Sequence, residues 1–235
     1  MDTSSDTRLL VVAAHPDDET LGAGGTIAKF SSIGARVKVI FLGEGVTARY
    51  PKGEIYSDES RKAGIKRTES AKRALSILGV TDFKFGNRLC TQFDEYSLLD
   101  IVKEIEFEMD AFKPSIILTH NKSDVNVDHR ITNQAVEIAT RPYGKDYLNE
   151  VYSFEIACSS SWVYEDRFEP NVFVDIGPFI ETKLLAWSQY DGEERPFPFP
   201  RSEKGLLTLA NYRGIMSGLA YAEAYRLMRR VVRHA

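Results

Sequence analysis

An apolar run leads directly into a cluster of charged residues near the start of the chain. Leu9–Ala14 contains no polar side chain, as expected for a parallel strand that is buried on both faces. The next five residues, His15–Glu19 (HPDDE), contain one imidazole and three carboxylates. Carboxylates this close together repel one another unless a cation compensates them. The cluster therefore predicts a metal site at the end of a buried strand.

The first two thirds of the chain alternate between apolar runs and helical patterns. The runs that predict strands are Leu9–Ala14, Arg36–Leu42, Phe83–Phe85 and Ser115–Thr119. Helices are expected between and after them at about 22–32, 57–79, 96–112 and 128–140. Strands separated by helices of this size form right-handed βαβ units. We therefore expect an α/β fold with a Rossmann-like, mostly parallel sheet that is flanked by helices.

The last third of the chain has a different pattern. Residues 151–157 and 171–176 predict strands, and residues 178–190 predict a helix. From Ser202 onward the spacing of apolar residues predicts one long amphipathic helix, whose solvated end would carry Arg226, Arg229, Arg230 and Arg233. We expect a single domain over 1–235, with a Rossmann-like core at 1–142 and a C-terminal strand and long-helix elaboration at 143–235.

A second polar cluster follows the strand Ser115–Thr119 and contains His129. Because the carboxyl ends of parallel strands meet at one edge of a sheet, we expect His129 to lie near His15 and Asp18. Two imidazoles and one carboxylate form a facial set for a divalent ion and leave positions open for water and substrate. Asp17 would then lie beside the ion, as a general base in a hydrolase must.

Three further residues at this edge have open roles. Asp128 could cap the helix that begins there, orient a ligand histidine, or do both. His120 directly follows its strand, so it could contact the substrate or be a buried structural histidine. Arg49, in the loop after the second strand, could bind a phosphate or carboxylate of a substrate, since a guanidinium binds such groups through two hydrogen bonds. Alternatively, Arg49 could be an ordinary surface arginine without a role in binding.

Two segments of unusual composition, one rich in glycine and one rich in proline and phenylalanine, predict local structure. Gly22, Gly24 and Gly25 do not have the spacing of a dinucleotide-binding loop, and the carboxylates before them would repel a phosphate. We therefore expect these glycines to permit close packing of a helix on the sheet. Prolines and phenylalanines alternate over 196–200, which predicts an extended segment that could line the pocket or form a contact in a homo-oligomer.

Composition limits the partners and the compartment. The net charge of −4 argues against a nucleic acid as the main partner. The only cysteines are Cys90 and Cys158, too few for a disulfide framework, which favours a reducing compartment. The polar N-terminus and the short apolar run behind it predict neither a signal peptide nor a membrane span. We therefore expect a cytoplasmic protein.

The chain resembles the PIG-L/LmbE-like deacetylases. The resemblance is carried by His15–Glu19 with the glycine-rich segment Gly22–Thr26, by Asp128-His129-Arg130, by Arg67–Gly79, and by Arg213-Gly214 with Ala222-Glu223-Ala224. It implies hydrolysis of the N-acetyl group of an amino sugar, a sugar nucleotide or another small conjugate, with zinc, or in some members iron, as the metal. It also implies that His15, Asp18 and His129 bind the metal and that Asp17 is the general base.

One position departs from the pattern of the family. Many members have a histidine three residues before the metal-binding histidine, where this chain has Asn126. An asparagine amide can donate a hydrogen bond to an oxyanion but cannot deliver a proton. The acid role would then fall to Asp17, or to another group such as His120.

Two other hypotheses remain open at this point. A metal-dependent phosphoesterase would use the same ligands and a second metal, for which Asp124, Asp128 and Glu19 are the available carboxylates. A non-catalytic sugar- or nucleotide-binding protein would bind its ligand without turnover. Asn126 is the only feature that favours the non-catalytic protein, because the set of ligands and the base are otherwise complete.

Overall fold

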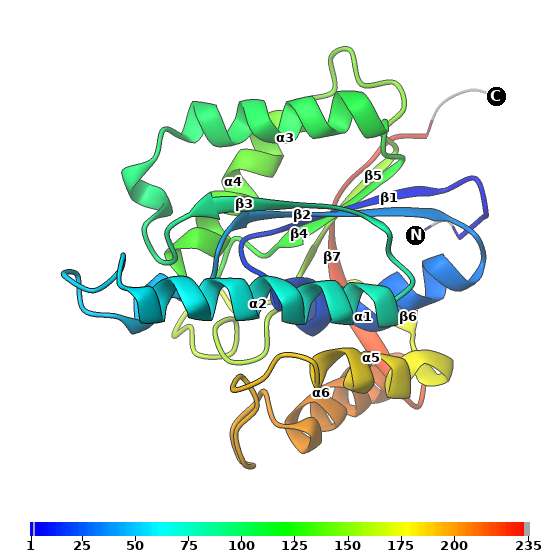
Figure 1. Cartoon of the computed structure of the whole chain (residues 1–235). Helices are drawn as coiled ribbons and strands as arrows, with labels where there is room; N and C mark the ends of the chain where they lie inside the picture. The colour runs from blue at the N-terminus through cyan, green and yellow to red at the C-terminus, as the bar shows by residue number, and fades with distance from the viewer. Residues whose placement is uncertain (2, 233–235) are drawn as a thin grey trace.

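A seven-stranded sheet with the strand order β3-β2-β1-β4-β5-β7-β6 forms the centre of the protein (Figure 1). The computed structural model describes residue 1 and residues 3–232. The strands are β1 (Arg8–Ala13), β2 (Arg36–Gly43), β3 (Asp82–Arg88), β4 (Ile116–His120), β5 (Glu150–Phe154), β6 (Val172–Asp175) and β7 (Ala222–Arg230). All pairs from β3 to β5 are parallel, whereas β7 is antiparallel to both β5 and β6. The predicted α/β fold with a mostly parallel sheet is confirmed.

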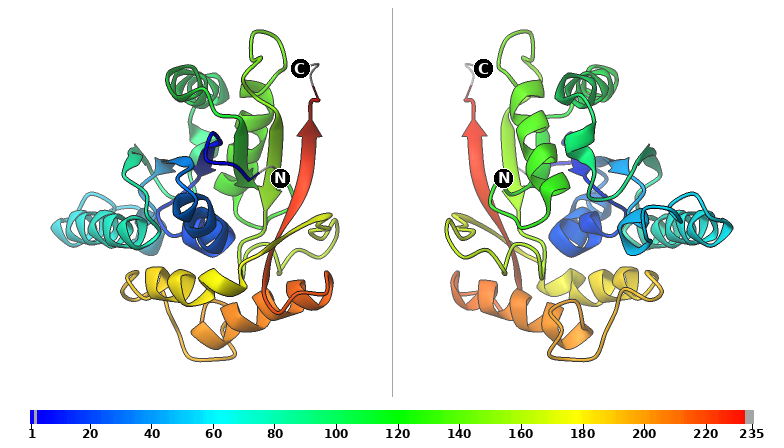
Figure 2. Two further views of the ribbon diagram at one scale, coloured as in Figure 1. Left: turned by 90° about the vertical axis from the view of Figure 1, so that its right-hand side faces the viewer. Right: turned by 90° about the vertical axis from the view of Figure 1, so that its left-hand side faces the viewer.

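Helices cover both faces of this sheet (Figures 1 and 2). They are α1 (Asp18–Ser32), α2 (Asp58–Ile77), α3 (Leu98–Phe112), α4 (Val127–Ala139), α5 (Ile180–Trp187) and α6 (Glu203–Ile215), with short 3₁₀ turns at Thr47–Arg49, Phe93–Glu95 and Gly177–Phe179. α3 and α4 lie on one face, and α1 and α2 lie on the other. α5 packs against α1 and α2, and α6 packs against β7. No helix among the described residues is both long and apolar enough to cross a membrane.

The apolar run of β1 is buried because it packs on both sides. Leu9, Val11 and Ala13 belong to the core cluster that includes residues of α1, α2 and α5. Leu10 and Val12 belong to the core cluster on the side of α3 and α4. This alternation is the one that a central parallel strand requires, because successive side chains point to opposite faces. β1 therefore places the residues that follow it at the middle of the sheet edge.

The prediction of one long helix from Ser202 onward is wrong. α6 ends at Ile215, and Gly218 has a φ of +74° in the turn that follows it. The chain then returns as β7, in which Ala222, Ala224 and Tyr225 are buried. β7 pairs with the edge of β5, which would otherwise remain unpaired.

The arginines near the C-terminus consequently do not lie at a helix end. Arg226, Arg229 and Arg230 are residues of β7. Arg230 forms an ion pair with Glu150 of β5 at 3.1 Å, and Arg229 donates to the carbonyl of Thr140. Arg233 lies outside the described residues. The predicted interaction of this cluster with a helix dipole is therefore absent for the three described arginines.

Smaller differences concern the ends of elements. α1 begins at Asp18 instead of near residue 22, so the carboxylate cluster already belongs to its first turn. β4 includes His120 as its last residue. The predicted helix over 178–190 is helical as α5 over Ile180–Trp187, after a 3₁₀ turn. Each shift moves a boundary by a few residues and leaves the type of element unchanged.

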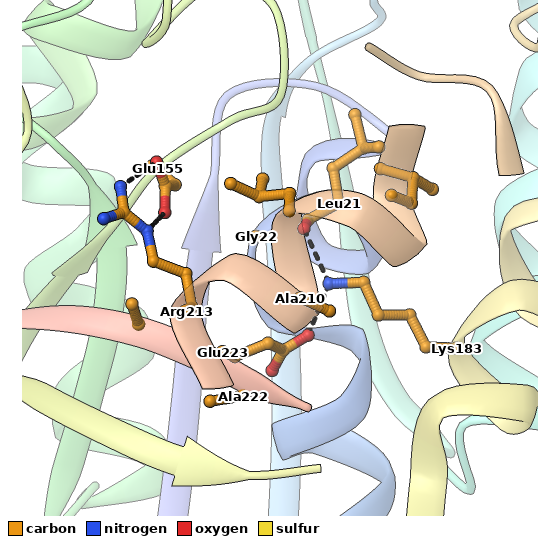
Figure 3. A pocket seen from close by; sticks show the side chains of 11 residues that line it. Leu21, Gly22, Glu155, Lys183, Ala210, Arg213, Ala222 and Glu223 are labelled. Atoms are coloured by element: carbon orange, nitrogen blue, oxygen red, sulfur yellow. Dashed lines mark hydrogen bonds and ion pairs between the residues drawn. The ribbon is translucent and has the colours of Figure 1, made fainter. Parts of the chain in front are cut away.

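A buried ion pair joins the C-terminal part of the chain to α1 (Figure 3). The Nζ atom of Lys183 lies 2.6 Å from the Glu223 carboxylate and donates to the carbonyl of Leu21 at 2.9 Å. Glu223 also accepts hydrogen bonds from the backbone N–H groups of Gly25 at 2.9 Å and Thr26 at 2.8 Å. Because these partners satisfy both charges away from water, α5 and β7 constrain the helix whose first turn carries the carboxylate cluster.

The glycines of α1 permit close packing, as the sequence predicts. A Cβ atom at Gly22 would overlap the ring of Phe154, and one at Gly25 would lie 2.7 Å from Cγ2 of Ile176. Gly64 of α2 is a useful contrast, because the nearest atom to its Cβ position is Cγ2 of Val46 at 3.8 Å.

We expect Gly22→Ala, but not Gly64→Ala, to lower the stability of the protein. Overpacking against Phe154 should lower the free energy of unfolding of Gly22→Ala by about 1–3 kcal/mol. Gly64→Ala should be neutral or stabilising by up to about 1 kcal/mol, because alanine is the better helix former. Urea unfolding measures both, and equal effects of the two substitutions would contradict a packing role for Gly22.

Candidate metal centre

Three potential metal ligands converge at the carboxyl ends of β1 and β4. His15 lies in the turn after β1, Asp18 is the first residue of α1, and His129 lies in the first turn of α4. One ligand atom from each of the three side chains lies within 4.8 Å of the others, and all three residues are buried. The convergence of His15 with His129 is the one that the strand order predicts, because β1 and β4 are neighbours in the sheet.

Asp18 lies between the two imidazoles. Its Oδ2 atom is 3.6 Å from Nδ1 of His15, and its Oδ1 atom is 3.4 Å from Nε2 of His129. The backbone N–H of His15 donates to Asp18 Oδ2 at 2.8 Å, so the tight turn through Pro16 fixes the carboxylate relative to its neighbour. The sequence of this turn therefore determines the geometry of two of the three potential ligands.

A second carboxylate contacts the far nitrogen of each imidazole. Asp128 lies 2.8 Å from Nε2 of His15, and Asp124 lies 3.2 Å from Nδ1 of His129. Each ring therefore presents its other nitrogen toward Asp18. Metal-binding histidines typically have such a carboxylate partner, which fixes the tautomer and the orientation of the ring. The donor set of two nitrogens and one oxygen fits a divalent ion such as zinc.

The pKa shifts in this cluster indicate that it stabilises positive charge. Burial by itself lowers the pKa of His129, but the carboxylates of Asp18 and Asp124 raise it to about 9. Burial alone would raise the pKa of Asp18, but His129 and His120 lower it well below its usual range. A divalent cation could replace the proton of His129, since metal binding and protonation compete for the same nitrogen.

Asp17 occupies a strained position next to this set. Its φ of 128° is rare for any residue other than glycine. Its carboxylate accepts hydrogen bonds from Arg67 at 2.9 Å and from Arg201 at 3.3 Å. Burial raises the pKa of Asp17, although Arg67 and Arg201 oppose the effect. Strain of this kind persists only where the surroundings enforce it, which is common at functional sites.

Sequence reasoning missed the residues around Asp17. Arg67 of α2 contacts both Asp17 and Glu193, and Arg201 lies before α6. Arg49 is half exposed and forms ion-pair contacts with Glu193 at 2.6 Å and 2.8 Å. Arg49 is a candidate from the sequence because of its place in the loop after the second strand, and Arg67 has a signal because it belongs to a segment that carries the family resemblance. Glu193 and Arg201 lie in irregular segments whose positions no periodicity predicts.

His120 and Asp128 occupy positions that clarify their open roles. His120 is fully buried, stacks on His129 with ring centroids 4.0 Å apart, and accepts the N–H of Ala14 through Nε2. Burial, together with the nearby His129, lowers the pKa of His120 to about 4, so the ring is neutral. Asp128 does not cap α4. It contacts the ring of His15 and accepts the backbone N–H groups of Thr91 and Phe93.

Asn126 is the residue that caps α4. Its Oδ1 atom accepts the backbone N–H of Asp128 at 2.9 Å, as an N-cap residue does. The Nδ2 atom of Asn126 has no hydrogen-bond partner within the described part of the chain. Asn126 can therefore cap α4 through Oδ1 and still donate a hydrogen bond through Nδ2.

The carboxylates that a second metal would need are already bonded within the protein. Glu19 accepts hydrogen bonds from Thr20, Tyr190 and the backbone of Asp17. Asp124 accepts from Ser159, Ser160 and the backbone of Asn126. The partners of Asp128, named above, occupy both of its oxygens. This arrangement argues against a two-metal phosphoesterase.

We expect Asp124→Asn to weaken metal binding without abolishing it. The substitution keeps the shape of the side chain but removes the charge that faces Nδ1 of His129. Loss of such a partner typically lowers metal affinity about 10–100-fold. Competition with a chromogenic chelator measures the affinity, and Asp58→Asn at an exposed position of α2 is the matched control. Equal affinity in the two variants would contradict a role for Asp124 in orienting His129.

Two relatives of known activity align over most of this chain. Diacetylchitobiose deacetylase of Thermococcus kodakarensis is 28% identical over 238 residues, which cover 97% of this chain and 85% of the relative. A 1D-myo-inositol 2-acetamido-2-deoxy-α-D-glucopyranoside deacetylase of Mycobacterium sp. (strain KMS) is 30% identical over 224 residues, which cover 76% of this chain and 71% of the relative.

Solved structures share the fold. The 4-carboxy-2-hydroxymuconate hydratase of Pseudomonas putida superimposes with a TM-score of 0.76 at 22% identity, over 97% of this chain and 99% of that one. At this identity the likeness concerns the fold alone.

The family model described as "PIG-L: GlcNAc-PI de-N-acetylase" matches residues 10–140, which is more than half of the chain and includes His15, Asp18 and His129. The chain therefore belongs to the PIG-L family of de-N-acetylases.

Proposed function

We propose that the protein is a metal-dependent hydrolase that removes the N-acetyl group of an amino sugar or of its nucleotide or glycan conjugate. The observation that carries this proposal is the buried set of His15, Asp18 and His129 with a further carboxylate, Asp17, directly beside it. A hydrolase needs both a metal-binding set and a base that is not a ligand. Membership of the PIG-L family, and the deacetylase activities of the two aligned relatives, support the same reaction.

His15, Asp18 and His129 would hold the metal, for which we propose zinc, with iron as the alternative. Two nitrogen donors and one carboxylate oxygen suit zinc in its catalytic form, which keeps an open position. When bound, the ion would polarise the amide carbonyl and lower the pKa of water. Asp124 and Asp128 would hold the two imidazoles in the orientation that this binding requires.

Asp17 would act as the general base. Its carboxylate would take a proton from the attacking water, hold it, and deliver it to the nitrogen of the leaving amine. The raised pKa of Asp17, which burial causes, favours a group that must carry a proton during part of the cycle. Arg67 would fix the carboxylate through its hydrogen bond to Oδ2. We assign His120 a structural role, since it is neutral and its Nε2 already accepts the N–H of Ala14.

Asn126 would donate a hydrogen bond from Nδ2 to the oxyanion that forms on the acetyl carbonyl. Its Oδ1 remains on the N–H of Asp128, which fixes the direction of the amide group. This assignment needs no proton transfer from position 126.

We also propose that the protein is cytoplasmic. Its two cysteines, Cys90 and Cys158, are free, which is compatible with the reducing compartment expected from the sequence.

The test is release of acetate and free amine from a panel of N-acetyl sugars. The panel contains free N-acetylhexosamines, their nucleoside-diphosphate forms and glycoside conjugates, each with zinc-loaded protein and with a chelator-treated control. We expect one class to react and the chelator to stop the reaction. Asp17→Asn should lower kcat by about 10²–10⁴-fold while the metal content stays near that of the wild type. Full activity of Asp17→Asn would overturn the assignment of the base.

We expect substitutions of Asn126 to lower kcat even when the helix cap is kept. Asp and Ser both cap helices well, but neither can place an amide donor where Nδ2 lies. Asn126→Asp and Asn126→Ser should each lower kcat by about 10²–10³-fold, the usual effect of losing an oxyanion donor. Thermal unfolding should change little in both variants. Wild-type kcat in both would restrict Asn126 to its role as a cap.

A further inference from the structure

Three arginines from separate segments converge on two carboxylates beside the metal centre. Arg67 bridges the two, because Nη1 contacts Asp17 at 2.9 Å and Nη2 contacts Glu193. Arg49 contacts Glu193 with both terminal nitrogens, at 2.6 Å and 2.8 Å. Arg201 lies 3.3 Å from Asp17 and 4.0 Å from Glu193. The groups in contact thus carry three positive charges and two negative charges.

Stability alone does not explain such a cluster. Removing charged groups from water costs several kcal/mol for each ion, and apolar side chains of similar volume often stabilise a fold as well or better. Arg67 and Glu193 nevertheless have only 5% and 7% of their side chains exposed. Arg67 and Arg201 already pair with Asp17, so the pairing of Arg49 with Glu193 is not needed to neutralise the Asp17 carboxylate.

Glu193 does not belong to the core of the fold. It lies in the irregular segment between α5 and α6, whereas Arg49 follows β2 and Arg67 lies in α2. Its carboxylate contacts both guanidinium groups. The Arg49 side chain is 52% exposed, so the solvent reaches this pair from outside. An acidic group that arrives with a substrate would meet the same two guanidinium groups.

A cavity of about 90 Å³ adjoins this pair. Its lining includes Arg49, Lys66, Arg67, Ser70, Tyr190 and Glu193. Cationic and hydroxyl groups therefore outnumber the acidic groups, Asp191 and Glu193, on its walls. Guanidinium groups bind carboxylates and phosphates through two parallel hydrogen bonds, which makes them suited to such a pocket. Arg67 lines this cavity and also contacts Asp17.

We propose that Arg49 and Arg67 form an anion-binding subsite, and that Glu193 occupies it when no substrate is bound. The substrate is accordingly an N-acetylated amino sugar that also carries an acidic group, either a carboxylate or a phosphate. Its acidic group displaces the Glu193 carboxylate, while Arg67 keeps its contact with Asp17. The assignment of a substrate rests on the proposed deacetylase function, whereas the binding of an anion does not.

This proposal predicts opposite effects for two substitutions in one ion pair. Glu193→Gln removes the competing carboxylate and should strengthen the binding of an anion. Arg49→Gln removes one of the two guanidinium groups and should weaken it. An ion cluster that only supports the fold would give the same sign for both, because each substitution breaks the same contact.

Kinetics with matched substrates gives the first test. The probes are N-acetylglucosamine, N-acetylglucosamine 6-phosphate and N-acetylmuramic acid, with zinc-loaded enzyme. We expect at least one acidic probe to exceed the neutral sugar in kcat/KM by about tenfold or more, and the two acidic probes distinguish phosphate from carboxylate. Arg49→Gln should lower the acidic-to-neutral ratio by about tenfold, and Glu193→Gln should raise it. Arg61→Gln, at an exposed position of α2, is the control and should leave the ratio unchanged.

A binding measurement tests the subsite independently of turnover. Inorganic phosphate should raise the Tm of the zinc-loaded wild type, raise it further in Glu193→Gln, and lose most of its effect in Arg49→Gln. If this pattern holds while no N-acetyl sugar is hydrolysed, the subsite stands and the proposed function fails. An equal phosphate effect in the wild type and Arg49→Gln overturns the subsite, as does an acidic-to-neutral ratio that neither substitution changes.

Discussion

The carboxylate of Asp18 is the group on which the architecture of the site depends. It is buried between two imidazoles, and each imidazole has another buried carboxylate behind it. Such a set is unfavourable in a protein interior unless protons or a cation neutralise it. The rest of the fold is arranged to hold it: α1 begins at Asp18, and the ion pair of Lys183 and Glu223 constrains the same helix two turns later.

The sequence predicts the centre of this site well because local rules determine it. An apolar run buried on both faces must be a central strand, and residues that follow central strands meet at one edge. These two rules place His15, Asp18 and His129 together without any knowledge of contacts. Where several local readings agree, as they do here, a prediction from sequence is strong. Gly22 and Gly25 are predictable as packing positions for another local reason, because their spacing and the carboxylates before them do not fit a phosphate-binding loop.

The periphery is less predictable because distant segments form it. The apolar residues of β7 fit a helical spacing as well as a strand, and only the unpaired edge of β5 decides between the two. Glu193 contacts Arg67, and Arg201 contacts Asp17, each across more than a hundred positions of sequence, and both Glu193 and Arg201 lie in segments that have no periodic pattern. Their charges are visible in the sequence, but their partners are set by the packing of α5 and α6 on the core.

Asn126 caps α4, and its proposed role at the oxyanion would add a chemical requirement at the same position. Asparagine is among the best N-cap residues, and histidine is not. A chain with asparagine here gains a well-capped α4, whose first turn carries His129, and keeps an amide that can donate to an oxyanion. In the proposed mechanism, the proton transfer that a histidine could perform would depend on Asp17, and so on the arginines that hold its carboxylate. Because Arg67 contacts both Asp17 and Glu193, the proposed subsite would link the charge of the bound substrate to the basicity of Asp17 through one guanidinium group.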